Sequence, residues 1–500
     1  MKTKILIFLL LLPLAIFAQR GQKSDNAFHN RSFWQTKPTV ETVKQKIKEG
    51  HDAVTPNKAA FDAICYAIMA KAPVKTIEYL LSLPGNNINK PTHDGRSYLM
   101  WAGSAGDIAV MKLLLKKGAD TKVVGSHGFT WFTFTVNAGH ENTAIYDLMI
   151  ANGVDVKETN RAGANAILLM AGHSKDGKII SYFEKKGLDV KAEDNKGNNL
   201  LFYAAQRGNI ALIKKYIQKG FNYKKINSEG ENLVLFASHG ARGYSNSLTV
   251  YEYLATLGLD FTSSNKNEQN ALHFLASNAK EIAVVDFFIA KGIAIHQKDK
   301  EGNTPFLNAA RGHNQVILKK LMTSVSNINQ KNKEGFSAIT FATQRINGQL
   351  FSFLEAKGAD LNVVDADGNN LYYHLFTSYS RRTKADFELL VRALEKAKVP
   401  FEKASKNTSP LHIAVEKGDE KLILKALELG AEINKKNTEG LTPLHLAAMK
   451  ANNVSLLKML LSKGADKNML TDFEESAYDL AIENELLKKQ KLDIKFLKQS

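Results

Sequence analysis

The stretch TPLHLAA at residues 442–448 decides the fold of this chain. Thr442 is suited to cap the first turn of a helix, and Pro443 fits the first helical position because no hydrogen bond is lost there. The small residues Ala447 and Ala448 let a neighbouring helix approach closely. The apolar stretch LLKMLL at residues 456–461 follows and predicts a second helix. This part of the sequence therefore predicts a pair of short helices.

The same unit recurs along the chain with a period of about 33 residues. One set of glycines closes the second helices, and another set lies in the turns before the first helices. Glycine suits both places because it adopts positive φ at no steric cost. Two independent landmarks with one period indicate a repeat protein. The first set is Gly85, Gly118, Gly153, Gly187, Gly220, Gly258, Gly292, Gly358, Gly430 and Gly464, and the second is Gly95, Gly128, Gly163, Gly197, Gly230, Gly302, Gly335, Gly368 and Gly440.

These residues resemble the ankyrin repeat, whose signature is a turn, Thr-Pro-Leu-His-x-Ala and two helices. The full signature occurs at residues 442–447, and SPLHIA at residues 409–414 is nearly complete. Several central units keep the spacing but lack most residues of the signature. The resemblance implies an all-α solenoid of about 13 helix-turn-helix repeats with short hairpin-like turns between them. It also implies that His273, His412 and His445 hydrogen-bond the backbone between repeats, and that the chain has a binding role.

We predict three segments along the chain. Residues 1–18 form a secretory signal peptide, residues 19–54 a basic polar N-terminal segment, and residues 55–500 a single solenoid. The first and last units are atypical, which suits caps, because each end exposes a face that no neighbour covers. Insertions near residues 239–247 and 377–386 fall between the two helices of their units. We expect both insertions to protrude from one edge of the stack.

The signal peptide determines the expected location. Lys2 and Lys4 form a basic start, residues 5–17 are apolar, and Ala18 suits cleavage. This apolar core is too short to span a bilayer, and no later stretch approaches the roughly 18 to 20 apolar residues of a membrane helix. We therefore expect an exported protein, periplasmic or secreted, without membrane insertion after signal removal.

The sequence carries no sign of catalysis. We find no nucleophile elbow, phosphate loop, dinucleotide fingerprint or zinc-protease helix in it. The single cysteine, Cys65, lies in an apolar run and is expected to be a buried thiol. The 13 histidines show no convincing metal-ligand spacing. We expect a non-enzymatic protein without a cofactor or a metal site.

Arginines and two aromatic residues give a candidate partner site. Lysines gather at the ends of second helices, whereas several of the few arginines occupy turn tips or the ends of first helices. The guanidinium offers paired donors that suit carboxylate recognition. Two phenylalanines directly follow turn glycines, where they serve either partner contact or local packing. The candidates are Arg96, Phe129, Arg161, Arg207, Arg311, Phe336 and Arg345, and the competing interpretation of the arginines is that they are ordinary solvated residues.

Our first interpretation is a protein-protein interaction scaffold whose concave groove binds an acidic segment of a partner. The formal net charge of +17 raises a second possibility, nucleic acid or an anionic surface. That possibility needs arginine, lysine and aromatic side chains interleaved along one path, whereas the lysines are scattered, so no nucleic-acid partner is expected. A third possibility is a toxin, immunity or effector protein.

Overall fold

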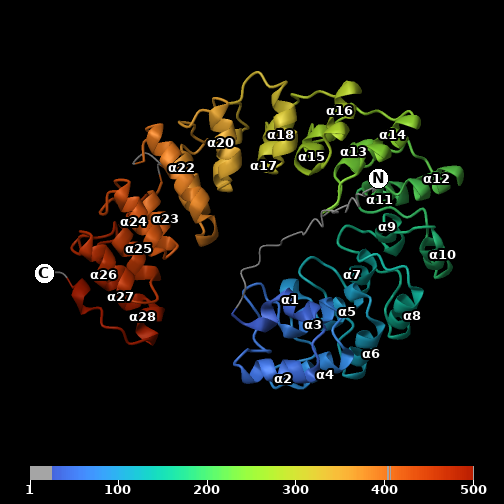
Figure 1. Ribbon diagram of the computed structural model, residues 1–500, viewed down its shortest axis with the longest axis horizontal. Coiled ribbons are helices and arrows are strands. Elements are labelled where there is room, and N and C mark those ends of the chain that lie inside the picture. Colours follow the sequence, from blue (N-terminus) through green and yellow to red (C-terminus); the bar gives the residue numbers. More distant parts are fainter. Residues whose placement is uncertain (1–24, 242, 402–404, 406, 499–500) are drawn as a thin grey trace, which may run out of the picture. The chain divides into compact units, whose positions relative to one another are not determined.

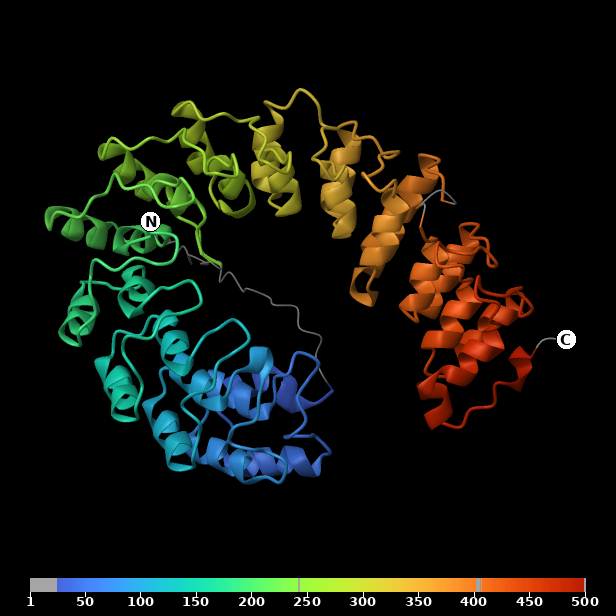
Figure 2. The ribbon, with the colours of Figure 1, turned by 180° about the vertical axis from the view of Figure 1, so that it is seen from behind.

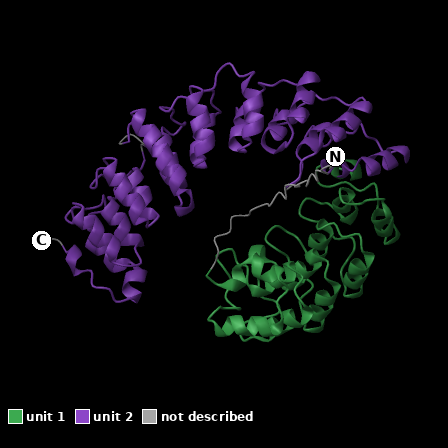
Figure 3. Ribbon diagram, viewed as in Figure 1, with its two compact units in different colours: residues 1–203 green, residues 204–500 purple. Residues whose placement is uncertain are grey.

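The structure is a computed structural model that describes residues 25–241, 243–401, 405 and 407–498 (Figure 1). The predicted signal peptide (residues 1–18) lies outside the described residues. The chain divides into two compact units, residues 1–203 and 204–500 (Figure 3). Among the described residues there is no β-strand, only four isolated β-bridges. The predicted all-α class is confirmed.

Unit 1 contains the helices up to α10, and α11 crosses the boundary between the units. The bounds are α1 Arg31–Gln35, α2 Val40–Lys48, α3 Ala63–Met69, α4 Val74–Ser82, α5 Tyr98–Ala105, α6 Ile108–Lys116, α7 Trp131–Asn137, α8 Thr143–Ala151, α9 Ala166–Ala171, α10 Lys178–Lys185 and α11 Leu200–Gln206. Two 3₁₀ turns are η1 Ala27–His29 and η2 His93–Gly95.

Unit 2 continues the same alternation of short helices. The bounds are α12 Ile210–Gln218, α13 Leu233–Ser238, α14 Leu248–Thr256, α15 Ala271–Asn278, α16 Ile282–Ala290, α17 Pro305–Arg311, α18 Gln315–Met322, α19 Ala338–Gln344, α20 Gly348–Ala356, α21 Leu371–Ser378, α22 Lys384–Lys396, α23 Pro410–Glu416, α24 Glu420–Glu428, α25 Pro443–Lys450, α26 Ser455–Ser462, α27 Ala477–Glu483 and α28 Glu485–Lys489. Two 3₁₀ turns are η3 Arg381–Thr383 and η4 Lys495–Leu497.

The core lies between successive helix pairs. Within unit 2, α15 contacts α17, α17 contacts α19, and α19 contacts α21, while α14 contacts α16 and α16 contacts α18. First helices therefore pack on first helices and second helices on second helices, as Figure 2 shows from behind. The first helices are short and almost entirely buried, as in α25, where Leu444, Ala447 and Ala448 are all buried. Each pair hides its apolar side on its neighbours, which is the physical basis of a solenoid.

N-terminal capping residues mark where the first helices begin. In α25, the side chain of Thr442 accepts a hydrogen bond from the His445 amide, and Pro443 stands in the first turn. Thr304 caps α17 in the same way, and Ser409 caps α23. These contacts satisfy amides that have no partner inside the helix.

Hairpins before the first helices join consecutive pairs through the backbone. The amide of Lys300 donates to the carbonyl of Asn267 at 3.0 Å, and the amide of Lys333 donates to the carbonyl of Glu301 at 2.9 Å. A polar side chain closes each hairpin from inside: Asp299 Oδ1 accepts from the amide of Asn303 at 2.8 Å. The repeated amide-to-carbonyl bond holds successive hairpins in register.

The described part of the N-terminal segment (residues 25–54) is helical and packed. Phe28, Trp34 and Val43 are fully buried. The indole Nε1 of Trp34 donates to the carbonyl of Phe28 at 2.9 Å, and Thr76 Oγ1 on α4 donates to the carbonyl of Pro38 at 2.8 Å. A helix pair thus stands before residue 55 and covers the face of the unit that begins there. Its sequence was predicted only as basic and polar.

The two insertions lie between first and second helices, α13 and α14 in one case and α21 and α22 in the other. The first folds back on the preceding pair: Tyr244 donates its hydroxyl hydrogen to the carbonyl of Arg207 at 2.9 Å, and the buried Asn246 Nδ2 donates to the carbonyl of Ala205 at 2.8 Å. In the second insertion, the largely exposed Arg381 forms an ion pair with Asp419 at 3.0 Å. Each insertion therefore extends from its own helix pair and also contacts a neighbouring helix pair.

Candidate functional site

A hollow of about 380 Å³ lies in unit 2 where three first helices end. Its walls come from the C-terminal ends of α17, α19 and α21. Carbonyl groups at helix C-termini carry a partial negative charge, which suits cationic side chains at these places. The lining residues are Arg311, Phe341, Gln344, Arg345, His374, Thr377 and Ser378.

Two exposed arginines stand at this hollow. Arg311 is the last residue of α17, and Arg345 is the residue at which α19 ends. Neither forms an ion pair with a carboxylate among the described residues. Two guanidinium groups one repeat apart, each with free donors, can hold carboxylate groups of a ligand.

The wall beneath the arginines is aromatic and polar. Phe341 is 6% exposed. The Phe336 ring, which is half-buried, lies 5.8 Å from the Phe341 ring and 5.5 Å from the His374 ring between centroids, both edge to face. Gln344 Nε2 is 3.4 Å from His374 Nδ1. The site therefore combines cationic groups at its mouth with an aromatic wall.

His374 is fixed by its neighbours. Its Nε2 lies 3.1 Å from Asp365 Oδ2, and both side chains are buried. Burial lowers the pKa of His374, and the Asp365 carboxylate opposes that effect in part. A neutral, hydrogen-bonded imidazole supports the wall of the hollow.

Two of the seven predicted site residues, Arg311 and Arg345, thus line the hollow. Phe336 is not a lining residue, but its ring packs against the rings of two that are, Phe341 and His374. Phe336 therefore takes part in local packing, and its contact with a partner stays a prediction. Sequence reasoning missed His374 and the hydroxyl groups of Thr377 and Ser378 as lining residues, because that unit lacks the usual first-helix signature.

The candidates in unit 1 are engaged by their own chain. Arg96 forms an ion pair with Asp94 at 2.9 Å, and its side chain is 11% exposed. Its guanidinium lies 4.6 Å from the centre of the Phe134 ring, a cation–π arrangement. The Phe129 ring lies edge to face with Phe134 at 5.9 Å. Arg96 and Phe129 therefore both pack against Phe134 in unit 1.

Neither of the two remaining arginines lines the hollow. Arg161 is exposed, and its side chain lies against the turn at Gly128, where an added Cβ would be 3.1 Å from Arg161 Cβ. Arg207 is half-buried, and this burial lowers its pKa. Of the seven predicted residues, only Arg311 and Arg345 line the hollow.

The signature histidines make the bonds that the resemblance implied. His412 Nε2 lies 2.9 Å from the carbonyl of Leu441, and His445 Nε2 lies 3.0 Å from the carbonyl of Met469. His273 Nε2 is 3.2 Å from the carbonyl of Asn303. Each ring joins the start of a first helix to the next hairpin. Burial lowers the pKa of all three histidines, so they serve as neutral structural groups.

Cys65 is buried on α3, as predicted, and burial is the main cause that raises the pKa of its thiol. Over the described ranges, no cluster of three or more histidine, cysteine or acidic side chains is placed to hold a metal ion. None of the helices described is both long and apolar enough to cross a bilayer.

Comparison with known families adds the deciding observation. The family described as "Ankyrin repeats (3 copies)" matches residues 272–365 and 378–471, which include all residues that line the hollow except His374 and Thr377. These two stretches of the chain are ankyrin repeats. Ankyrin repeats generally mediate protein-protein interactions and are typically non-enzymatic scaffolds.

The curated relatives share low sequence identity with this chain, and each relative is much longer than the part of it that aligns. Alpha-latroinsectotoxin-Lt1a of Latrodectus tredecimguttatus is 24% identical over 60% of this chain and 22% of that protein. L-asparaginase of Dirofilaria immitis is 25% identical over 31% of this chain and 25% of that protein. Palmitoyltransferase AKR1 of Lachancea kluyveri is 28% identical over 23% of this chain and 16% of that protein. The chain thus spans a quarter or less of the relatives it matches.

Proposed function

We propose that this ankyrin-repeat protein is a non-catalytic scaffold that acts outside the cytoplasm, in the periplasm or after secretion. It binds an acidic segment of another protein through the hollow beside Arg311 and Arg345. The observation that carries the proposal is the pair of exposed arginines over an aromatic wall, in a family that generally binds proteins. A carboxylate placed there gains paired charge-assisted hydrogen bonds.

The chemistry of the wall supports a peptide ligand. Gln344, Thr377 and Ser378 offer amide and hydroxyl groups that can bond a peptide backbone. Phe336 offers part of an aromatic face to an apolar side chain. Toxicity, the property that one relative's name suggests, is not part of the proposal, because the aligned part is 22% of that protein.

The test is capture of a partner from the native envelope by purified protein, with the double variant Arg311→Glu/Arg345→Glu. We expect capture to be lost while the thermal unfolding midpoint stays unchanged, since both side chains are exposed. The matched control is Arg31→Glu/Arg392→Glu, which makes the same charge change on α1 and α22 and should capture normally. Equal capture by both variants would overturn the proposed site.

Location is tested separately from binding. Fractionation of cells that express the full chain should place it in the periplasm or the medium, shortened by about the length of residues 1–18. A full-length cytoplasmic product would overturn the extracytoplasmic part of the proposal and leave the binding site intact.

A further inference from the structure

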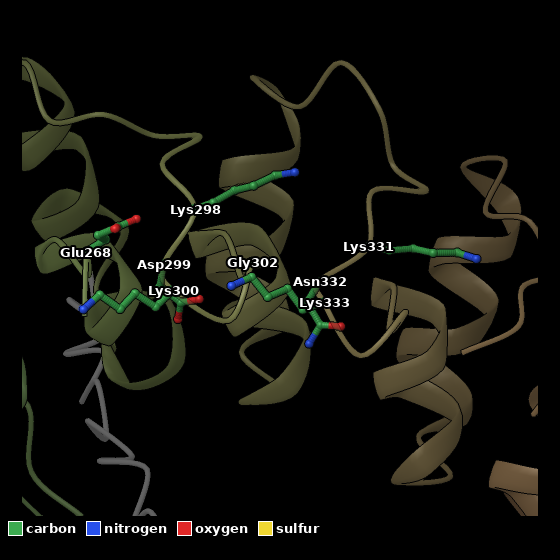
Figure 4. Close-up of a pocket in the computed structure, with 8 residues that line it drawn as sticks. All are labelled: Glu268, Lys298, Asp299, Lys300, Gly302, Lys331, Asn332 and Lys333. Atoms are coloured by element: carbon green, nitrogen blue, oxygen red, sulfur yellow. The ribbon is translucent and has the colours of Figure 1, made fainter. Parts of the chain in front are cut away.

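A second cationic hollow, of about 430 Å³, is lined by three successive hairpins of unit 2 (Figure 4). Its lysines come from two of these hairpins, which precede α17 and α19, and Glu268 comes from the hairpin before α15. Four of the eight lining residues are lysines. The full lining is Glu268, Lys298, Asp299, Lys300, Gly302, Lys331, Asn332 and Lys333.

One of the two carboxylates that line the hollow, that of Asp299, already accepts hydrogen bonds from its own hairpin. Asp299 Oδ1 accepts from the amides of Glu301 and Asn303 at 3.0 and 2.8 Å, and Asp299 Oδ2 lies 3.3 Å from Gln269 Nε2. Asp299 is buried, and both of its carboxylate oxygens take part in these contacts. The remaining lining carboxylate is Glu268, which forms no ion pair with a lysine among the residues described. The lysine charge therefore exceeds the acidic charge at the hollow.

Lys300 and Lys333 form a matched pair. They occupy equivalent places in consecutive hairpins, and each amide bonds the hairpin before it. In Figure 4 their side chains point in the same direction, while Lys298 and Lys331 point the other way. Neither Lys300 nor Lys333 forms an ion pair in the described part of the chain, whereas Lys331 Nζ bonds the carbonyl of Val364 at 2.9 Å. Neighbouring packed helices are about 10 Å apart, so the two hairpins that carry these lysines are spaced on that scale.

The lysine pair and the arginine pair belong to the same two repeats. Lys300 and Arg311 lie at opposite ends of one hairpin-helix segment, and Lys333 and Arg345 at opposite ends of the next. In the second segment, Phe336 and Phe341 lie between Lys333 and Arg345 and pack on one another. The seven residues of α19 span about 10 Å at 1.5 Å per residue. In the second repeat, cationic residues thus stand on both sides of an aromatic pair whose half-buried member is Phe336.

We infer that the acidic segment lies across both repeats, with carboxylates at its two ends and an apolar side chain between them. This inference rests on the proposed function and adds a sequence pattern for the partner. A span of roughly 15 to 20 Å corresponds to about five or six extended residues at 3.3 Å each. The lysine hollow binds one acidic end, Arg311 and Arg345 bind the other, and Phe336 contacts the apolar residue.

A peptide fits this surface better than a nucleic acid does. A phosphate polymer presents charge at every unit, with no apolar gap to match the Phe336 region. Single-stranded nucleic acid also needs aromatic stacking beside its phosphates. No aromatic residue lines the lysine hollow. The alternation of cationic, aromatic and cationic surface matches a chain whose side chains differ along its length.

The test uses the purified full chain and labelled synthetic peptides, with affinity measured by fluorescence anisotropy at fixed salt. The reference peptide has two Asp/Glu pairs that flank one Leu, with the pairs five residues apart. Lys300→Gln/Lys333→Gln should weaken it about tenfold, as loss of two exposed ion pairs predicts. The matched control Lys357→Gln/Lys463→Gln removes two exposed lysines at second-helix ends and should bind as the parent does. A peptide with the two acidic pairs adjacent should lose the dependence on Lys300 and Lys333.

The outcomes separate this inference from the proposed function. If Arg311→Glu/Arg345→Glu abolishes binding but the lysine variant does not weaken it, the bridging segment is wrong and the proposed site stands. If neither variant weakens binding, the bridging segment and the proposed binding site are both wrong. Tighter binding of inorganic polyphosphate or DNA than of the peptide at the same salt, through the same lysines, would overturn the peptide as ligand.

Discussion

His412 Nε2 lies 2.9 Å from the carbonyl oxygen of Leu441, so one imidazole joins the start of α23 to the hairpin before α25. His273 and His445 make the same connection in their own units. The other ring nitrogen of each histidine contacts its own helix cap, as His412 Nδ1 does with Ser409 Oγ at 2.7 Å. Each ring therefore spans two repeats and is buried in its neutral form.

These histidines make stability depend on pH. Burial lowers their pKa below the ordinary 6.5, so the unfolded chain binds more protons once the pH falls through that value. The stabilisation is fully present above pH 6.5 and is lost as the pH falls toward the lower folded pKa values. We expect the urea midpoint of unit 2 to drop between pH 7.5 and 5. His412→Gln should reduce this slope, while the exposed-site control His296→Gln should leave it unchanged. A midpoint that rises on acidification would contradict the argument.

Gly335 should not tolerate a side chain. A Cβ there would lie 2.6 Å from the amide nitrogen of Ala366 and 2.8 Å from the carbonyl carbon of Asp365, both of them backbone atoms of the next hairpin. Gly358 has a similar φ, +87° against +78°, but open space around its Cβ position. Both alanine variants carry the strain of positive φ, about 1 kcal/mol, and only Gly335→Ala adds a clash. We expect Gly335→Ala to lose about 2 kcal/mol more than Gly358→Ala in denaturant unfolding. Equal losses would show that the hairpins shift freely.

Asp62 is a buried carboxylate that depends on Lys90. Its Oδ2 lies 3.1 Å from Lys90 Nζ and accepts the hydroxyl of Tyr98 at 2.5 Å, while Oδ1 caps α3 through the Cys65 amide. Removing one partner leaves a buried charge short of compensation. Because Lys90 is partly exposed, we expect Lys90→Met to cost about 1 to 3 kcal/mol in unit 1. Asp62→Asn/Lys90→Met should recover part of that loss in a double-mutant cycle. Purely additive losses would refute the coupling.

The sequence predicted the repeated helix pairs because their landmarks are local. Turn glycines, Thr-Pro caps and the signature histidines each act within a few residues, so Thr442 and His445 could be placed without tertiary information. The candidate site was predicted less completely. Arg311 and Arg345 follow from the repeat register, whereas Arg96 is occupied by Asp94 and Phe134, contacts that no single-repeat pattern reveals.

The lysine hollow was missed for a related reason. Lys300 and Lys333 lie 33 positions apart in sequence and meet only when consecutive hairpins stack. The gathering of lysines at second-helix ends is visible within one repeat, whereas the pairing of Lys300 with Lys333 appears only when the hairpin positions of consecutive repeats are compared. Aligning the hairpins by their closing residues, Asp299 and Asn332, would have shown the pair.

The packed segment before residue 55 yields the last prediction. Trp34 is fully buried on α1, its ring centroid lies 5.8 Å from that of Phe28, and α1 contacts α3. Trp34→Ala should cost about 3 to 5 kcal/mol locally, as loss of a buried aromatic does. A solenoid is stabilised by nearest-neighbour contacts, so the damage should stay near that end. Hydrogen exchange should accelerate in α1 to α4 and stay unchanged in α23 to α26, while Trp34→Phe should retain most protection. Unchanged exchange in α3 and α4 would mean that this helix pair does not cap the stack, and uniform acceleration would mean that the repeats unfold as one cooperative body.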